Sequence, residues 1–479
     1  MEFPGQSVRP FLIGNQWRET GTRLPVINPY SGQTVAEVCQ AGMTEAEEAI
    51  SLAVRASPAM AQLPSHIRAG ALGQVAKALL TRQEEFAHTI SIESGKPIAD
   101  SRREAMRAIQ TFTIASEETK RLPGDIIPMD LAPGMDHHFG MLRRVPIGPV
   151  LGITPFNFPL NLVAHKVAPC LAAGNPIVIK PAPQTPLTAL LLGEILMESG
   201  LPIGAVSVLP CENQVAELMV RDPRFKALSF TGSASVGWML KDKAGKKRVL
   251  LELGGNAAVI VEPDANIELA VHRCLTGGFS FSGQTCISVQ RLYIHDQVYD
   301  PFVENFINRV GLIACGDPLN EATVVGPLIN EGAARRVEDW IQEAASQGAS
   351  VLTGGKRQGS MVDPTVMAEV RQDMKVSCEE VFGPVVTLTR YREFDQALEL
   401  VNDSPFGLQA GVFTEDVNKI FRAYRKLEVG TVLANEIPTF RAEHMPYGGV
   451  KDSGLGREGV RYVIEELTEP KLLVLNLPH

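Results

Sequence analysis

The segment from about Val150 to Pro263 alternates short apolar or β-branched runs with helical patterns, and this alternation restricts the fold more than any other feature. Strands separated by helices of about 10–15 residues are typical of βαβ units and a parallel sheet. A second alternating region extends from about Ala265 to Glu436. We therefore expect an α/β fold with two layers in tandem. The expected strands are Val150–Thr154, Ile177–Lys180, Ala205–Leu209, Ala227–Phe230, Val249–Leu253, Ala257–Val261, Arg291–His295, Ala349–Leu352, Val385–Tyr391, Ala410–Phe413 and Thr431–Asn435, and the expected helices are Leu160–Ala173, Leu187–Ser199, Gln214–Arg221, Ser235–Lys243 and Ala333–Ser346.

Two segments fit neither layer. Gly124–Val145 is rich in Pro, Gly and His, and Lys471–Pro478 is an apolar run that no later segment covers. An exposed apolar terminal strand is an edge that pairs readily with another strand. Pairing with a second subunit is our preferred interpretation, and docking on the chain's own body is the alternative.

Composition excludes several classes of protein. The 479 residues are enough for two to four domains. The formal net charge of −9 disfavours binding to nucleic acid or to an anionic membrane, because such proteins carry a basic excess. Seven cysteines without a C-x-x-C pair disfavour a disulfide framework and a thiolate zinc site, so no metal is expected.

Targeting and membrane segments are not expected either. The start of the chain, MEFPGQSVRP, has no basic leader followed by an apolar region, unlike a signal peptide. Val145–Ala164 is uncharged, but its four prolines are incompatible with a membrane-spanning helix. The sequence therefore predicts a cytoplasmic protein.

Three residues stand out as candidates for catalysis. Cys286 lies in a small polar turn, Phe281–Ser288, just before a strand, and polar loops commonly carry catalytic groups. Glu252 interrupts an apolar strand, where burial would raise its pKa towards that of a general base. Asn157, held between prolines, is placed to donate to an oxyanion. Taken singly, each has an ordinary explanation: a packed cysteine, an edge-strand carboxylate and a turn asparagine.

A glycine-serine turn at Gly232–Ser233 follows one strand and opens a helix. The backbone N–H groups and positive dipole end of such a helix favour a phosphate. The signal is weak by itself, because Gly-Ser is also a common helix cap and no G-x-G-x-x-G motif is present.

In order along the chain, these features are PFNFP, FTGSxxxG, ELGGN and a GQ-x-C cysteine that lies 34 residues after Glu252. In that order they closely resemble the NAD(P)-dependent aldehyde dehydrogenase superfamily, from about residue 10 to the end of the chain. Lys180 in IKPA, EEVFGP at 379–384 and PYGGVKDSG at 446–454 add to the resemblance.

The resemblance implies a division of the chain into three parts. A Rossmann-like cofactor domain would comprise residues 1–123 and 146–256, and a second α/β catalytic domain residues 257–462. A small β oligomerisation element would combine residues 124–145 and 463–479 and build a homodimer or homotetramer.

The resemblance also implies roles for individual residues. Cys286 would attack the aldehyde and form a thiohemiacetal, whose oxyanion Asn157 and the Cys286 backbone N–H would stabilise. Hydride transfer to the nicotinamide would leave a thioester, which water activated by Glu252 would hydrolyse. The expected cofactor contacts are Thr154, Pro155, Phe156, Lys180, Pro183, Gly232, Ser233, Gly237, Leu253, Glu380 and Phe382.

Two choices within the family follow from single residues. Members that transfer the acyl group to coenzyme A tend to lack the equivalent of Glu252, so its presence favours a free acid as product. A coenzyme A-acylating enzyme, or a non-redox thiol acyltransferase that uses Cys286, is the alternative. NAD-selective relatives often carry a Glu where this chain has Pro183, so we expect either NAD or NADP as cofactor.

The residues aligned with the substrate pocket are unusually polar. Arg107, Asn161 and His165 replace the apolar residues of relatives that oxidise apolar aldehydes, and Arg441 and His444 are expected near the pocket mouth. They favour a short polar or anionic aldehyde of the lactaldehyde, semialdehyde or phosphorylated-glyceraldehyde type. In the alternative, Arg107 is a solvated surface residue and His165 a core histidine, and the substrate is an unspecified aldehyde.

Overall fold

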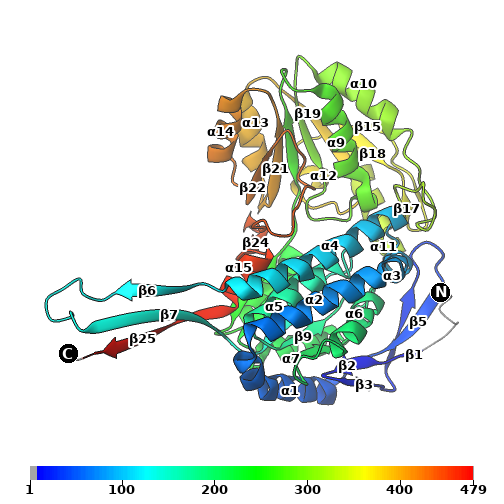
Figure 1. Cartoon of the computed structure of the whole chain (residues 1–479). Helices are drawn as coiled ribbons and strands as arrows, with labels where there is room; N and C mark the ends of the chain where they lie inside the picture. Colours follow the sequence, from blue (N-terminus) through cyan, green and yellow to red (C-terminus); the bar gives the residue numbers. More distant parts are fainter. Residues whose placement is uncertain (1–7, 478–479) are drawn as a thin grey trace.

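A computed structural model of the chain describes residues 8–477 and contains two large sheets with helices on their faces (Figure 1). The first is eight-stranded, with the order β24-β12-β11-β8-β9-β10-β2-β3. Its five central strands are parallel, whereas β24 and the β2–β3 hairpin add antiparallel edges. The strands are β2 (Phe11–Ile13), β3 (Gln16–Arg18), β8 (Val150–Ile153), β9 (Ile177–Lys180), β10 (Val206–Val208), β11 (Ala227–Thr231), β12 (Arg248–Glu252) and β24 (Gly454–Leu455).

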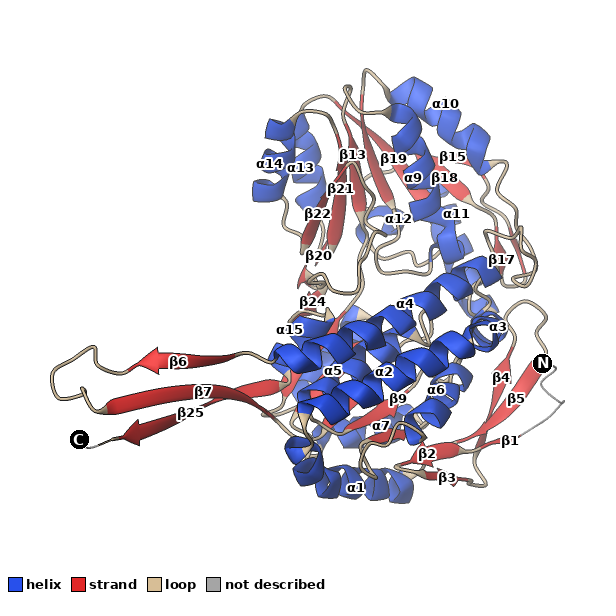
Figure 2. Cartoon of the chain, viewed as in Figure 1, coloured by secondary structure: helices blue, strands red, loops and turns tan. Residues whose placement is uncertain are grey.

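Helix α5 forms the centre of this layer. All 13 of its residues are buried, because it lies between the strands β8 and β9 and the helices α2 and α4. Figure 2 shows α2 and α4 outside α5, on one side of the sheet. The helices of this layer are α1 (Met43–Gln62), α2 (Ser65–Thr81), α3 (Gln83–Ser94), α4 (Ile98–Glu118), α5 (Asn161–Ala173), α6 (Leu187–Met197), α7 (Asn213–Arg221), α8 (Ala234–Lys243) and α15 (Val460–Glu466).

The second sheet is seven-stranded, with the order β15-β18-β19-β14-β13-β21-β22, and is parallel except for β15. Alternate residues of β13 face two separate cores: Val259 and Val261 pack beneath α9 and α10, and Ala258 and Ile260 beneath α13 and α14. Its strands are β13 (Ala258–Val261), β14 (Arg291–His295), β15 (Ser350–Thr353), β18 (Thr365–Ala368), β19 (Val385–Tyr391), β21 (Gln409–Phe413) and β22 (Thr431–Ala434), and its helices are α9 (Ile267–Phe279), α10 (Tyr299–Val310), α11 (Glu331–Ser346), α12 (Lys375–Cys378), α13 (Phe394–Asn402) and α14 (Val417–Lys426).

The expected α/β fold with two tandem layers is therefore confirmed, and each expected strand and helix is present with ends displaced by at most two residues. The antiparallel strands β2, β3 and β24 were not anticipated. Because β24 pairs with β12, the chain has returned to the first sheet by Gly454, ahead of the domain boundary expected at residue 462.

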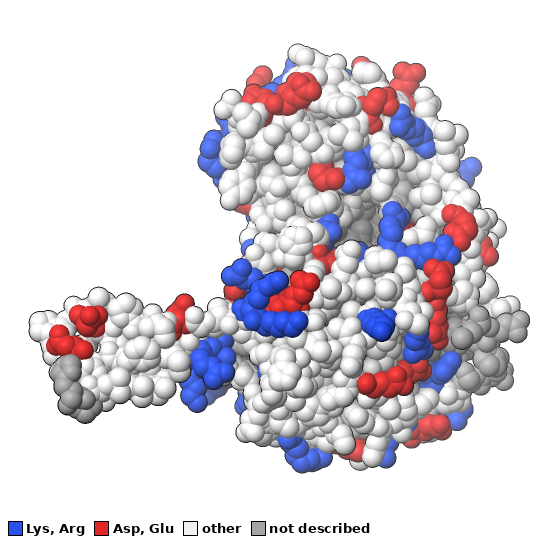
Figure 3. Space-filling view, viewed as in Figure 1, with Lys and Arg blue, Asp and Glu red and all other residues white. Residues whose placement is uncertain are grey.

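A three-stranded sheet projects from the body as an arm (Figure 1), with the order β25-β7-β6. It is formed by β6 (Gly124–Pro128), β7 (His138–Pro146) and β25 (Thr468–Asn476). Strand β25 pairs with β7 of its own chain along nine residues, which covers one of its edges, and it is the outer strand of the arm, so its other edge has no partner strand within residues 8–477. Leu472–Leu475 nevertheless stay 38–46% exposed, and uncharged surface predominates on the view of the arm in Figure 3.

Short elements complete the structure, and no helix within residues 8–477 is long and apolar enough to cross a membrane. They are β1 (Val8–Arg9), β4 (Arg23–Ile27), β5 (Thr34–Cys39), η1 (Thr119–Arg121), η2 (Ser280–Gly283), β16 (Arg357–Gln358), β17 (Met361–Val362), β20 (Phe406–Gly407) and β23 (Val450–Lys451).

Candidate active site

A cavity of about 370 Å³ brings together residues from both layers. It lies beyond the carboxyl ends of β8, β11 and β12, which is where open parallel sheets bind ligands. All three expected catalytic residues line it. The lining residues are Arg107, Pro155, Phe156, Asn157, Phe158, Asn161, Leu162, Thr231, Gly232, Ser233, Glu252, Leu253, Gly254, Thr285, Cys286, Ile287, Arg336, Glu380, Phe382, Arg441, Tyr447 and Glu458.

Cys286 is presented by a tightly folded loop between η2 and β14. Phe281, Ser282 and Gly283 adopt successive left-handed conformations, and a Cβ atom at Gly283 would lie 2.1 Å from the carbonyl oxygen of Gly383. Gln284 anchors the loop, since its side chain donates to the carbonyl of Pro327 and accepts from the N–H of Ile329. The thiol therefore occupies a fixed position on the cavity wall.

The surroundings of Cys286 oppose ionisation of the thiol. Burial raises its pKa to about 12, while a hydrogen bond with Tyr447, 3.0 Å from Sγ to Oη, lowers it. A cysteine is a nucleophile as the thiolate, so the site must supply donors or positive charge when it reacts.

Glu252 ends strand β12 and faces the same cavity. It is buried, and its Oε2 atom has no hydrogen-bond partner among residues 8–477. Burial, and then the neighbouring charge of Glu458, raise the pKa of Glu252 well above its ordinary value. An unpartnered buried carboxyl group with a raised pKa has the properties of a general base.

Asn157 follows β8 and connects the cavity to the cysteine loop. Its Nδ2 donates to the carbonyl of Gln284 at 3.0 Å, which fixes the amide two residues from Cys286. One N–H of the same Nδ2 remains for a ligand, because an amide nitrogen carries two hydrogens.

The polar residues expected near the substrate fall into two groups. Arg107 and Asn161 line the cavity, together with Arg441. His165 is buried behind the wall, and His444 is exposed to solvent; neither is among the lining residues. His165 is therefore the core histidine of our alternative interpretation, and burial lowers its pKa.

Two buried carboxylates explain why these cations are tolerated, and the sequence interpretation did not identify them. Glu443 accepts from Arg107 Nε at 2.5 Å and also bonds His165. Glu458 accepts from Arg441 at 3.0 Å and pairs with Lys166 at 3.4 Å. Neither carboxylate stood out in the sequence, because Glu443 is followed by His444 and Glu458 is preceded by Arg457.

Residues expected to hold the cofactor are divided in the same way. Pro155, Phe156, Gly232, Ser233 and Leu253 line the cavity, as do Glu380 and Phe382. Thr154, Lys180, Pro183 and Gly237 do not. Of these, Thr154 is buried and Pro183 is exposed, whereas Lys180 donates a hydrogen bond to Asn213 at 3.4 Å. Gly237 contacts Leu253 closely, since a Cβ atom at Gly237 would lie 2.3 Å from a methyl group of Leu253.

The geometry fits a dinucleotide. Helix α8 starts directly after the Gly232–Ser233 turn, and no side chain caps its first N–H groups, so they remain available to a phosphate. Glu380 accepts the N–H of Gly255 at 3.0 Å, and burial raises its pKa to about 7.

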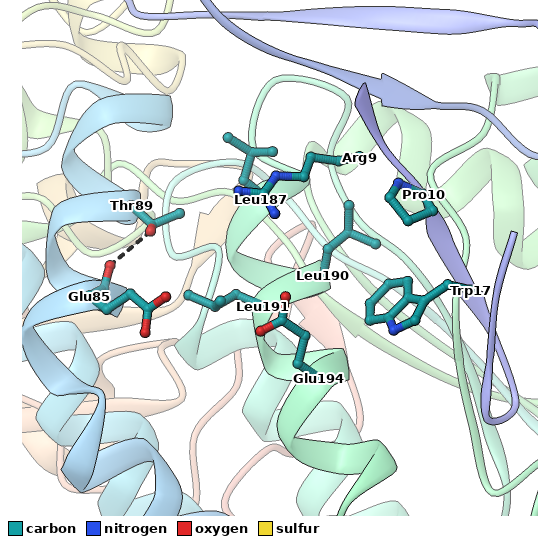
Figure 4. Close-up of a pocket in the computed structure, with 9 residues that line it drawn as sticks. All are labelled: Arg9, Pro10, Trp17, Glu85, Thr89, Leu187, Leu190, Leu191 and Glu194. Carbon is teal, nitrogen blue, oxygen red and sulfur yellow. Dashed lines mark hydrogen bonds between the residues drawn. The ribbon is translucent and has the colours of Figure 1, made fainter. Parts of the chain in front are cut away.

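A second cavity, of about 220 Å³, lies between α3, α6 and β3 (Figure 4). Its carboxylates, Glu85 and Glu194, are both paired with Arg82, and none of its nine lining residues is a Cys, Ser, His or Lys. This cavity has no nucleophile comparable to Cys286.

The aldehyde dehydrogenase family model matches residues 17–473, so the chain belongs to that family. It is therefore an oxidoreductase that acts on aldehydes with NAD or NADP.

Three similar proteins illustrate the match. The 3-sulfolactaldehyde dehydrogenase of Priestia aryabhattai is 42% identical over 466 residues, 97% of either chain. The structure of aldehyde dehydrogenase 21 from Physcomitrella patens, in complex with the reaction product succinate, has a TM-score of 0.97 and 44% identity over 98% of both chains. The glyceraldehyde-3-phosphate dehydrogenase GapN of Methanocaldococcus jannaschii, complexed with NADP, has a TM-score of 0.92 and 37% identity, covering 96% of this chain and 99% of its own.

Proposed function

We propose that this enzyme oxidises a short aldehyde with an anionic or hydroxylated end to the free carboxylic acid. The observation that carries the proposal is a single cavity lined by Cys286, Arg107 and Arg441. Each guanidinium group has five N–H donors and uses only part of them on Glu443 or Glu458, so donors remain for a substrate anion. The three relatives named above carry sulfolactaldehyde, succinate or glyceraldehyde 3-phosphate in their names, all of them anionic compounds.

In this proposal Cys286 is the nucleophile. Its thiolate forms a C–S bond to the aldehyde carbon while the π electrons move to oxygen, giving a thiohemiacetal oxyanion. Asn157 Nδ2 and the backbone N–H of Cys286 donate to that oxygen. A bound NAD or NADP would supply the hydride acceptor, so that loss of hydride from this carbon would leave a thioester on Cys286.

Glu252 completes the reaction. It removes a proton from water, the water oxygen adds to the thioester carbon, and the C–S bond breaks to release the acid and the Cys286 thiolate. A buried base with an unpartnered oxygen supports hydrolysis over transfer to coenzyme A or a non-redox acyl transfer.

The cofactor would bind beside the carboxyl ends of β11 and β12. Gly232, Ser233 and the start of α8 would hold the pyrophosphate, Lys180 and Glu380 a ribose, and Phe382 with Leu253 the nicotinamide. Thr154, Pro155 and Phe156 shape the loop beside it, and Gly237 lets Leu253 approach. Pro183 presents no carboxylate to a ribose phosphate, so both NAD and NADP are accepted.

We further propose a cytoplasmic homodimer or homotetramer. Residues 1–123 and 146–256 would form the cofactor domain, 257–462 the catalytic domain apart from Gly454–Leu455, which pair with the first sheet, and 124–145 with 463–479 the oligomerisation element. The exposed apolar side chains Leu472–Leu475 on an edge strand support association through the arm. All seven cysteines are free, as in proteins of a reducing compartment.

The test is a panel of aldehydes assayed with NAD and with NADP. It contains lactaldehyde, succinate semialdehyde, glyceraldehyde 3-phosphate and a long apolar aldehyde. We expect the anionic substrates to have the highest kcat/KM, and Arg107→Ala to lower kcat/KM for them by about 10- to 100-fold, because a hydrogen bond to a charged group contributes about 1.5–3 kcal/mol.

The matched control is Arg121→Ala, which removes an exposed arginine far from the cavity. Preference for the apolar aldehyde, or an equal effect of Arg107→Ala on every substrate, would contradict the proposed substrate class. Full activity of Cys286→Ala would contradict the mechanism.

A further inference from the structure

Tyr447 is a buried residue that the mechanism above does not use. It lies in the segment between β22 and β23, and it lines the cavity beside Cys286. Its backbone is fixed by two hydrogen bonds with Glu458, one in each direction. Its Oη atom lies 3.0 Å from Sγ of Cys286, so the phenol is directed at the reacting sulfur by a rigid backbone.

A cation supports the phenol from the other side. The guanidinium carbon of Arg441 lies 3.8 Å from the centre of the Tyr447 ring, and Glu458 holds that guanidinium group by an ion pair. A positive charge on the face of the ring withdraws electron density and makes the O–H a stronger hydrogen-bond donor.

The other charged groups around the sulfur are not sufficient to activate it. Glu380 and Glu252 both raise the pKa of the Cys286 thiol, in addition to burial. Arg441 lowers it, but this guanidinium group stacks on the Tyr447 ring and pairs with Glu458. The phenol is thus in hydrogen-bond contact with Sγ in a site that otherwise disfavours a thiolate, and toward a thiolate it can only donate.

We propose that Tyr447 is a catalytic residue that stabilises the Cys286 thiolate by donating its O–H to Sγ, with Arg441 strengthening that donor. This inference rests on the proposed role of Cys286 as the nucleophile. On ionisation the thiol proton passes to solvent, while Tyr447 keeps its own proton, because burial raises the phenol pKa well above its ordinary value. The same hydrogen bond stabilises the thiolate when it leaves the thioester carbon.

The experiment measures the rate at which iodoacetamide alkylates Cys286 as a function of pH, with peptide mass spectrometry to assign the modified residue. We expect Tyr447→Phe to raise the apparent pKa of Cys286 by about one to two units and to slow its alkylation at neutral pH by tenfold or more. The ring is kept, so the buried packing is preserved. Alkylation of Cys378, which is half-exposed and outside the cavity, serves as the internal reference.

The matched control is Tyr391→Phe, which also removes a buried phenol hydroxyl, here one that bonds Glu262 in the second layer. We expect this variant to leave the Cys286 profile unchanged even where it lowers the unfolding temperature. Equal shifts in both variants would attribute the effect to general destabilisation and overturn the proposal.

A second arm strengthens the donor instead of deleting it. Replacement of all seven tyrosines by 3-fluorotyrosine makes each phenol more acidic. The apparent pKa of Cys286 should fall in the labelled enzyme and stay unchanged in labelled Tyr447→Phe. The role of Tyr447 is refuted if the apparent pKa of Cys286 changes neither in Tyr447→Phe nor in the 3-fluorotyrosine-labelled enzyme. Alkylation needs neither aldehyde nor cofactor, so this result does not depend on the aldehyde assays. An aldehyde-oxidising Cys286→Ala would instead refute the proposed function.

Discussion

Replacing Glu252 with Gln separates the two halves of the proposed reaction. The substitution keeps the size of the side chain and removes the base, so hydride transfer should proceed while hydrolysis of the thioester stalls. We expect a burst of reduced cofactor equal to one equivalent per active site, followed by slow turnover.

The neighbouring carboxyl groups set the size of the effect. Glu458 cannot replace the base, because the charges of Lys166 and Arg441 outweigh its burial and hold its pKa at about 2. Glu380, with a pKa of about 7, is partly ionised at neutral pH but is held by the N–H of Gly255 on the cofactor wall. General base catalysis contributes about 10²–10⁴-fold, so we expect deacylation to slow by about 10³-fold, or about 4 kcal/mol of activation free energy.

Stopped-flow absorbance of the reduced nicotinamide measures the burst, and mass spectrometry of the quenched enzyme detects the acyl group on Cys286. Glu93→Gln is the matched control, because Glu93 is also a buried carboxyl group with a raised pKa, about 8, but caps α6 away from the cavity. Steady turnover of Glu252→Gln without a burst would refute the role of Glu252.

Three further predictions concern pH, stability and backbone strain. Hydrolysis requires ionised Glu252, whose pKa burial raises, so kcat limited by deacylation should keep rising with pH well beyond the ordinary pKa of a glutamate; a flat profile would contradict this. Glu443→Gln should lower the free energy of unfolding in urea at pH 7 by about 2 kcal/mol. His165 and Arg107 depress the pKa of Glu443 despite its burial. The difference in unfolding free energy between the two proteins should therefore shrink as the pH falls from the unfolded pKa of about 4.3 towards the lower folded pKa. A difference that stays constant with pH would contradict this role of Glu443. Gly283→Ala should abolish activity and lower thermal stability, since a Cβ atom would meet the carbonyl of Gly383 in a left-handed backbone; a fully active variant would show that the loop is not rigid.

Much of the fold follows from local sequence patterns. The expected strand Ile177–Lys180 is β9 with the same bounds, and the polar loop that carries Cys286 does precede β14 as expected. Asn157 follows β8 and Glu252 ends β12, and the carboxyl ends of these parallel strands lie along one edge of the sheet. The two residues therefore share one cavity, which Cys286 also lines.

The sequence by itself determined the two α/β layers and the three residues proposed for catalysis, because periodicity and short motifs depend on neighbours along the chain. The tertiary structure decided what surrounds them. Arg107 and Glu443 are in contact although 336 positions separate them in the sequence, and Cys286 and Tyr447 although 161 positions separate them. A local sequence pattern therefore could not show that the guanidinium group has a buried counter-charge or that the thiol lies beside a phenol. It likewise decided that His165 lies behind the wall, His444 in solvent and β25 against its own β7, because burial and strand pairing depend on which distant segments pack together.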